Sequence, residues 1–215
     1  MIKKRLTPFT FLLLIINLNL MAILLALIWG YIKGELSVKF EEHGFITTFS
    51  SLQLLACSVP CTLIYIKRKQ FIWLIIAIGF VFLALDEKFL IHENLDFWIH
   101  QVLNMTETTM TDRIDDFLIL LYGLVGLSLL IWKRKEFLND KNGLILLSFG
   151  FLLMVISVVF DTITNDNTMG LRHILNGSTD MIYHVGIVSE ESFKIISEAF
   201  LLAAFYAFYR NYNTK

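Results

Sequence analysis

The chain has 215 residues, of which 56% are hydrophobic, with 19 Phe, only 2 Pro and a mean hydropathy of +0.67. This composition is typical of an integral membrane protein that crosses the bilayer several times, and it excludes an ordinary soluble domain. The formal net charge of −1 shows no overall basic excess, so no nucleic-acid partner is expected.

Six apolar segments approach or exceed the roughly 20 helical residues needed to cross the hydrocarbon core of a membrane. They cover residues 9–31, 45–66, 71 to about 91, 117–132, 144–164 and about 185–209. We therefore predict a single domain, residues 1–215, that is an all-α bundle of six transmembrane helices. Basic clusters at residues 3–5, 67–69 and 133–135 and at the C-terminal end fall at alternate helix ends. By the positive-inside rule, both termini are expected in the cytoplasm.

The second apolar segment carries small polar residues that lipid would not tolerate. Thr48 and Ser51 recur at helical spacing and predict a polar face that looks into the bundle, to which Gln53 adds an amide. Cys57 and Cys61 lie one helical turn apart with a proline between them. This spacing is poor for a disulfide, so we predict that both are buried small residues beside a proline kink.

Ionisable residues follow directly on the third apolar segment: Asp86, Glu87, Lys88, His92 and Glu93. An ionisable residue inside a membrane is costly, and it is therefore a functional-site candidate by default. If the helix continues, Asp86, Glu93 and His100 share one face, because they are seven residues apart. Carboxylate and imidazole side chains suit a divalent metal ion such as Zn, Fe or Mn.

Helical rise places acidic residues of four different helices in one layer near the outer edge of the membrane core. These are Asp86, Asp115, Asp116, Asp161 and Glu191, with Glu41, His43, His92 and Glu93 expected just above them. Carboxylates gathered in a low-dielectric layer repel one another unless cations intervene. A metal ion would compensate them, or the chain's own cations would do so in a buried ion-pair network: Lys88, Arg113 and Lys194.

A short stretch of the chain resembles a motif in a group of prokaryotic membrane proteins. The sequence Phe82-Leu83-Ala84-Leu85-Asp86-Glu87, followed by Ile91-His92-Glu93, resembles a Leu-Asp-Glu and His-Glu pattern in uncharacterised multi-pass membrane proteins of bacteria and archaea. The resemblance implies a protein of the prokaryotic plasma membrane, and the positive-inside rule then places the charged site on the extracytoplasmic side. It implies no particular activity.

Our first hypothesis for the function is a metal-dependent membrane enzyme that acts on a lipid or a lipid-linked substrate. The predicted metal ligands are Asp86, His92 and Glu93, together with Asp116 or Asp161. Glu87 or Glu191 would act as general base, because a metal-bound water needs a nearby carboxylate to take its proton.

Two other functions fit the same pattern. In a cation or proton transporter, Lys194, Glu198 and Gln53 would continue the path below the outer acids, with Glu198 as the deepest of them. In a non-catalytic scaffold or sensor subunit, the acids would form an ionic surface outside the membrane.

Overall fold

The computed structural model describes residues 6–34, 37–41, 43–104, 114–165 and 179–214, without the side chains of 115–116, 161–165, 179–183 and 214. In these residues the chain is all-helical, which confirms the all-α part of the predicted fold class there. The eight described helices are α1 (Pro8–Lys33), α2 (Phe45–Arg68), α3 (Phe71–Phe89), α4 (Ile91–Leu103), α5 (Ile114–Trp132), α6 (Arg134–Phe137), α7 (Lys141–Asn165) and α8 (Thr179–Thr214).

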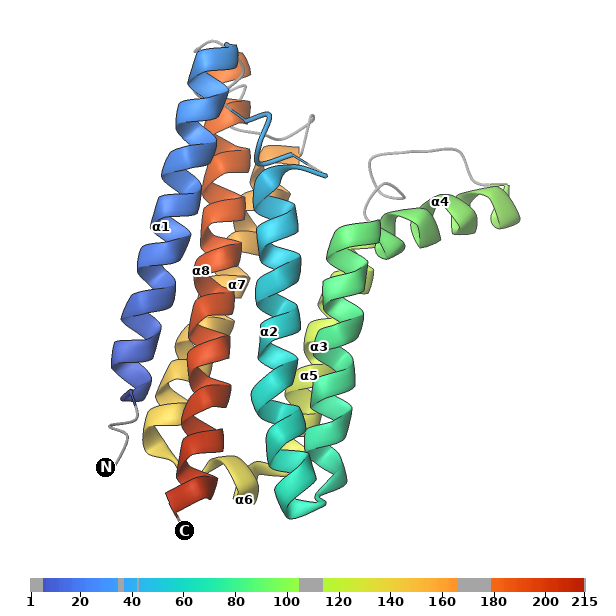
Figure 1. Ribbon diagram of the computed structural model, residues 1–215. Helices are drawn as coiled ribbons and strands as arrows, with labels where there is room; N and C mark the ends of the chain where they lie inside the picture. Colours follow the sequence, from blue (N-terminus) through green and yellow to red (C-terminus); the bar gives the residue numbers. More distant parts are fainter. Residues whose placement is uncertain (1–5, 35–36, 42, 105–113, 166–178, 215) are drawn as a thin grey trace.

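Four of these helices are long and apolar enough to cross a membrane, which is the character of an integral membrane protein. The qualifying stretches are Pro8–Lys33, Phe45–Arg68, Lys141–Phe160 and His184–Asn213. The other two predicted spans, α3 and α5, run alongside them in Figure 1. They meet the same criteria less well, because α3 carries three charged residues in its last turn and the apolar part of α5 is limited to Phe117–Trp132.

The two ends of the bundle differ in charge. The start of α1, the end of α8, the α2–α3 turn and α6 lie together in Figure 1. We call this the basic end because it carries Lys67, Arg68, Lys69, Lys133, Arg134 and Lys135. The opposite end, where α2 begins and α3 finishes, is the acidic end, with Glu41, Asp86, Glu93 and Glu191. The predicted clustering of basic residues at one side is therefore present in the folded chain.

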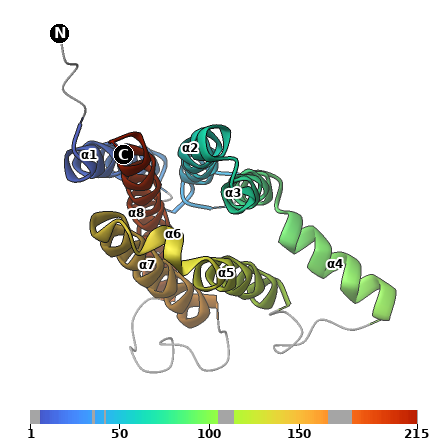
Figure 2. The same cartoon turned by 90° about the horizontal axis from the view of Figure 1, so that it is seen from below.

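Helix α8 is the centre of the bundle. It packs along α7, along α2 and along α1, and Figure 2 shows it between these three helices. Small residues of α8 are fully buried in these contacts, including Ala199, Ala203 and Ala204. Small side chains allow neighbouring helices to approach closely, which is how helices associate inside a membrane.

Aromatic side chains fill the interior near the basic end. Trp73 of α3 is fully buried, and its ring lies 5.2 Å from that of Phe137 and 6.0 Å from that of Phe208. Phe205 of α8 packs edge-on against Phe80 of α3, with ring centroids 5.0 Å apart. Offset and edge-on ring pairs of this kind are favourable beyond the apolar area that they bury. This half of the bundle is therefore tightly packed and apolar.

The third predicted helix is not continuous. Leu90 adopts left-handed backbone angles, φ 52° and ψ 49°, so α3 ends at Phe89 and α4 begins at Ile91 in a new direction. Figure 1 shows α4 leaving the acidic end sideways, away from the bundle. The condition for a shared face of Asp86, Glu93 and His100 is therefore not met, because such a face requires an unbroken helix.

Candidate functional site

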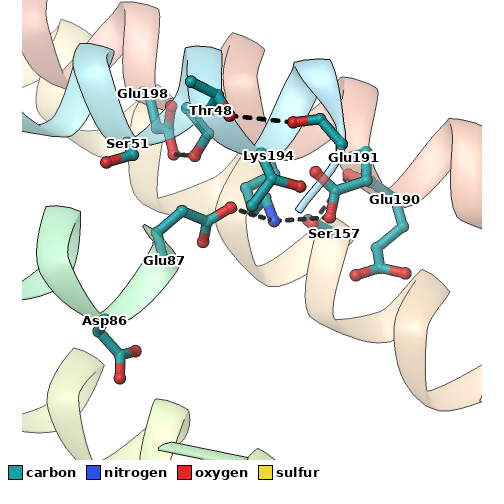
Figure 3. Close-up of polar contacts among 12 residues, drawn as sticks. Thr48, Ser51, Asp86, Glu87, Ser157, Glu190, Glu191, Lys194 and Glu198 are labelled. Atoms are coloured by element: carbon teal, nitrogen blue, oxygen red, sulfur yellow. Dashed lines mark hydrogen bonds and ion pairs between the residues drawn. The ribbon is translucent and has the colours of Figure 1, made fainter. Parts of the chain in front are cut away.

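An ion-pair cluster joins α3 to α8 inside the bundle. The Lys194 ammonium lies 2.6 Å from Glu191 Oε1 and 2.8 Å from Glu87 Oε1. Figure 3 shows the two carboxylates approaching the ammonium from different helices. The three side chains are only 20%, 15% and 10% exposed for Lys194, Glu87 and Glu191. Lys194 thus lies between carboxylates, where a metal ion or one of the chain's own cations was expected.

Helical geometry explains which acids enter this cluster. Glu191, Lys194 and Glu198 are three and four residues apart, so they share one face of α8. Successive residues of a helix point about 100° apart, and the neighbours Asp86 and Glu87 therefore diverge. Glu87 faces α8, whereas Asp86 points away from the cluster in Figure 3. The sequence predicted one acidic layer, and the structure divides it into two separate groups.

Glu198 lies one turn deeper than Lys194 and is 1% exposed. Its Oε1 atom accepts a hydrogen bond of 2.6 Å from the Ser50 hydroxyl of α2. Its Oε2 atom is buried without a hydrogen-bond partner. A carboxylate in this environment lacks the partners that normally offset the loss of water. Together with Glu87 and Glu191, it leaves more negative than positive charge around Lys194.

Two amide side chains converge beside Glu198. The Asn19 amide of α1 and the Gln53 amide of α2 both donate to the backbone oxygen of Ile195, at 2.6 Å and 2.8 Å. Asn19 is 0% and Gln53 6% exposed, and the amide oxygens of both are buried without a partner. Three helices therefore place acceptor oxygens in the same dry region. From the sequence, Asn19 is expected only to hydrogen-bond a neighbouring helix, and it does so. Ser50 had not been singled out, because the predicted polar face of α2 was drawn through Thr48 and Ser51.

Polar side chains of α2 also contact the end of α3. Lys88 donates to the Thr48 hydroxyl at 3.0 Å, and Ser51 donates to the backbone oxygen of Ala84 at 2.7 Å. These bonds confirm that the small polar face of α2 looks into the bundle. They also fix the last turn of α3, which carries Glu87 to α8.

Asp86 and His92 form the second group, at the corner between α3 and α4. The Asp86 carboxylate accepts from the His92 backbone N–H at 2.9 Å and lies 2.9 Å from His92 Nδ1. A carboxylate that accepts a free N–H at the start of a helix stabilises that helix end. Asp86 is thereby used as the cap of α4.

The remaining predicted site residues lie elsewhere or outside the description. Glu41 and His43 are exposed in the link before α2, where the Ser37 hydroxyl donates to Glu41 Oε1 at 2.7 Å. The link ends at Gly44. This position requires glycine, because a Cβ atom there would lie 2.5 Å from the Glu41 backbone oxygen. The side chains of Asp115, Asp116 and Asp161 lie outside the described residues.

The described residues do not fit the predicted metal centre. They contain no group of three or more His, Cys, Asp or Glu side chains arranged to hold a metal ion. Asp86 and His92 bond to each other, and His92 Nε2 lies 3.8 Å from Glu93 Oε1. Glu87 and Glu191, the predicted general bases, both contact Lys194 instead. The Zn, Fe or Mn site stays a prediction, and so does the role of Asp116 or Asp161 as one of its ligands.

Comparison with known proteins gives a family without an activity. A family model described as Domain of unknown function (DUF8692) matches residues 37–208. No curated protein and no solved structure matches the chain. The matched residues include both the cluster around Lys194 and the corner at Leu90.

Proposed function

Because the chain belongs to this family of unknown function, we propose a function from its own geometry: transport of protons or other small monovalent cations across a membrane. One observation carries the proposal. Glu198 is a carboxylate 1% exposed in the middle of a candidate span, and one of its oxygens has no partner. Ionisable groups in this position characterise ion pathways and proton relays.

The neighbouring cluster provides a route from the acidic end to Glu198. Glu87, Glu191 and Lys194 are partly accessible, and Glu198 follows Lys194 by one helical turn. Three carboxylates and one ammonium carry excess negative charge, which attracts a cation into a low-dielectric region. A cation or proton that reaches Glu198 relieves the cost of its buried charge.

The path is closed toward the basic end. Beyond Glu198, α8 buries Ala203, Ala204 and Phe205 against an interior that contains Trp73 and Phe80. Transport therefore requires the helices around Glu198 to move relative to one another, as in alternating access. The closest packing is within the pairs α2–α3 and α7–α8. The Glu87–Lys194 ion pair bridges these two pairs, as do the hydrogen bonds from Ser50 and Gln53 to α8, so these are contacts that such a movement would break or remake.

For this function we propose the membrane arrangement that was predicted from the sequence. In it, α3 and α5 complete six spans, both termini are cytoplasmic, and the acidic end faces outward from a prokaryotic plasma membrane. The distribution of basic residues supports this orientation. Membrane lipid is the expected surrounding.

Flux through the purified protein tests the proposal. The full chain would be reconstituted into liposomes that enclose either a pH-sensitive or a Na⁺-sensitive dye, and the movement of protons and of Na⁺ would be followed after a step in pH or in salt. We expect flux above that of protein-free liposomes, and its loss in Glu198→Gln, which removes the exchangeable charge. Glu190→Gln is the matched control, because Glu190 lies on α8 and points away from Lys194 in Figure 3.

Absence of flux in the wild type, or equal flux in Glu198→Gln, would contradict transport. A folded protein without flux would instead favour the scaffold or sensor role. Stoichiometric bound metal with hydrolysis of a lipid would favour the enzyme.

A further inference from the structure

We infer that Asn19, Gln53 and Glu198 form a binding site for a small monovalent cation of the sodium type. The inference deepens the proposed transport and rests on it, because it identifies an ion and the place where that ion is held. The site lies where α1, α2 and α8 meet, one turn below the Lys194 cluster.

The orphaned acceptor atoms are the first observation. Asn19 Oδ1, Gln53 Oε1 and Glu198 Oε2 are all buried without a hydrogen-bond partner, on side chains that are at least nine-tenths buried. In proteins, the great majority of buried polar atoms have a hydrogen-bond partner. Amide and carboxylate oxygens can only accept, so what they lack is a donor or a cation.

The bonds made by the same side chains place the three groups around one turn of α8. Both amide nitrogens contact one atom, the backbone oxygen of Ile195, which lies one turn before Glu198 on α8. Ser50, three residues before Gln53 on α2, holds the other oxygen of Glu198. These bonds orient the amide groups and the carboxyl group from three directions.

A cation satisfies this arrangement better than a proton does. A proton on Glu198 Oε2 can be donated to only one of the two amide oxygens, so one of the three acceptors stays unpaired. Hard cations coordinate several carbonyl, amide and carboxylate oxygens at once. A single charge matches the single carboxylate, and the ammonium of Lys194 one turn away disfavours a divalent ion.

Thermal unfolding of the purified full chain in detergent tests the site. Cys57 and Cys61 are free and fully buried, so a thiol-reactive fluorescent dye reports their exposure on unfolding. Midpoints would be measured in NaCl, KCl and choline chloride at equal ionic strength. We expect a saturable rise with Na⁺ that choline does not give, because an ion that binds only the folded state stabilises it.

The variants remove one ligand at a time. Asn19→Leu and Gln53→Leu should weaken the apparent Na⁺ affinity at least about tenfold, and Glu198→Gln should abolish the Na⁺ response. Asn17→Leu is the matched control: Asn17 lies on the same helix but is exposed and donates to Leu13 of its own helix at 2.7 Å. If Glu198→Gln fails to fold, the two leucine variants decide, since each leaves one amide on Ile195.

The outcomes separate this site from the proposed function. Equal midpoints in NaCl and choline chloride, or an unchanged Na⁺ response in Asn19→Leu and Gln53→Leu, would overturn the site, even if proton flux were found. A selective Na⁺ response without any flux would support the site and contradict transport.

Discussion

Lys194 is held between two carboxylates at a depth where a charge can remain only if it is paired. Removing one member of a buried ion pair typically costs about 3–5 kcal/mol, because the other member stays buried and uncompensated. We therefore expect Lys194→Met to lower the free energy of unfolding by that amount, since both Glu87 and Glu191 lose their partner. Chemical denaturation in detergent, followed by circular dichroism, measures the change.

Lys88→Met is the matched control for this prediction. Lys88 lies next to Glu87 but donates to the Thr48 hydroxyl rather than pairing with the cluster. Its loss should cost no more than a single hydrogen bond from a charged group, about 1.5–3 kcal/mol. Adding Glu191→Gln to Lys194→Met should recover part of the stability, because one unpaired charge is removed. Equal losses in Lys194→Met and Lys88→Met would show that the ion pairs do not hold α3 to α8.

At the scale of the helices, the corner at Leu90 depends on Asp86. We expect Asp86→Ala to free the first turn of α4 and to cost about 0.5–2 kcal/mol, the usual range for a lost helix cap. Hydrogen–deuterium exchange should then become faster in α4 while α2 and α8 keep their protection. Gln101→Ala is the control, since Gln101 is an exposed residue of the same helix, far from its first turn. Unchanged exchange in α4 of the Asp86→Ala variant would contradict the capping role.

Helix α4 has the pattern of a helix that lies in the membrane surface. Ile91, Leu95, Trp98 and Val102 recur at helical spacing, and the large side chains of Trp98 and Val102 are exposed. Because α4 leaves the bundle sideways at the acidic end, its apolar side would meet the lipid headgroup region.

An environment-sensitive fluorophore tests this placement of α4. In a chain with Cys57→Ala and Cys61→Ala, a label on Trp98→Cys should be quenched by brominated lipid more strongly than one on Glu93→Cys. Residues 93 and 98 differ by five positions and so point about 140° apart. Equal quenching at both positions would contradict an interfacial helix.

For the whole molecule, the helices could be predicted from the sequence and their corners could not. A long apolar run predicts a helix, because inside a membrane its backbone N–H and C=O groups must hydrogen-bond within the segment. The predicted spans lie within the observed helices, except at the end of the third. Leu90 has no preference for left-handed backbone angles, so nothing local indicates the break after α3.

The partners of the site residues were harder to predict than their depth. Lys194 was expected among the cations that compensate the acids, but its pairing with Glu87 rather than Asp86 depends on the rotation of α3 against α8. That rotation is set by packing across the bundle, which helical spacing within one segment does not encode. The same reason hid the contact of Ser50 with Glu198.

The central claim is that Glu198 exchanges its cation or proton within the membrane, and infrared difference spectroscopy tests it at the atom concerned. A change of pH or of Na⁺ concentration over a film of the reconstituted protein should produce a band for a buried protonated carboxyl group. This band should be lost in Glu198→Gln and retained in Glu190→Gln. A difference spectrum without a buried carboxyl band, or one unchanged by Glu198→Gln, would contradict the account.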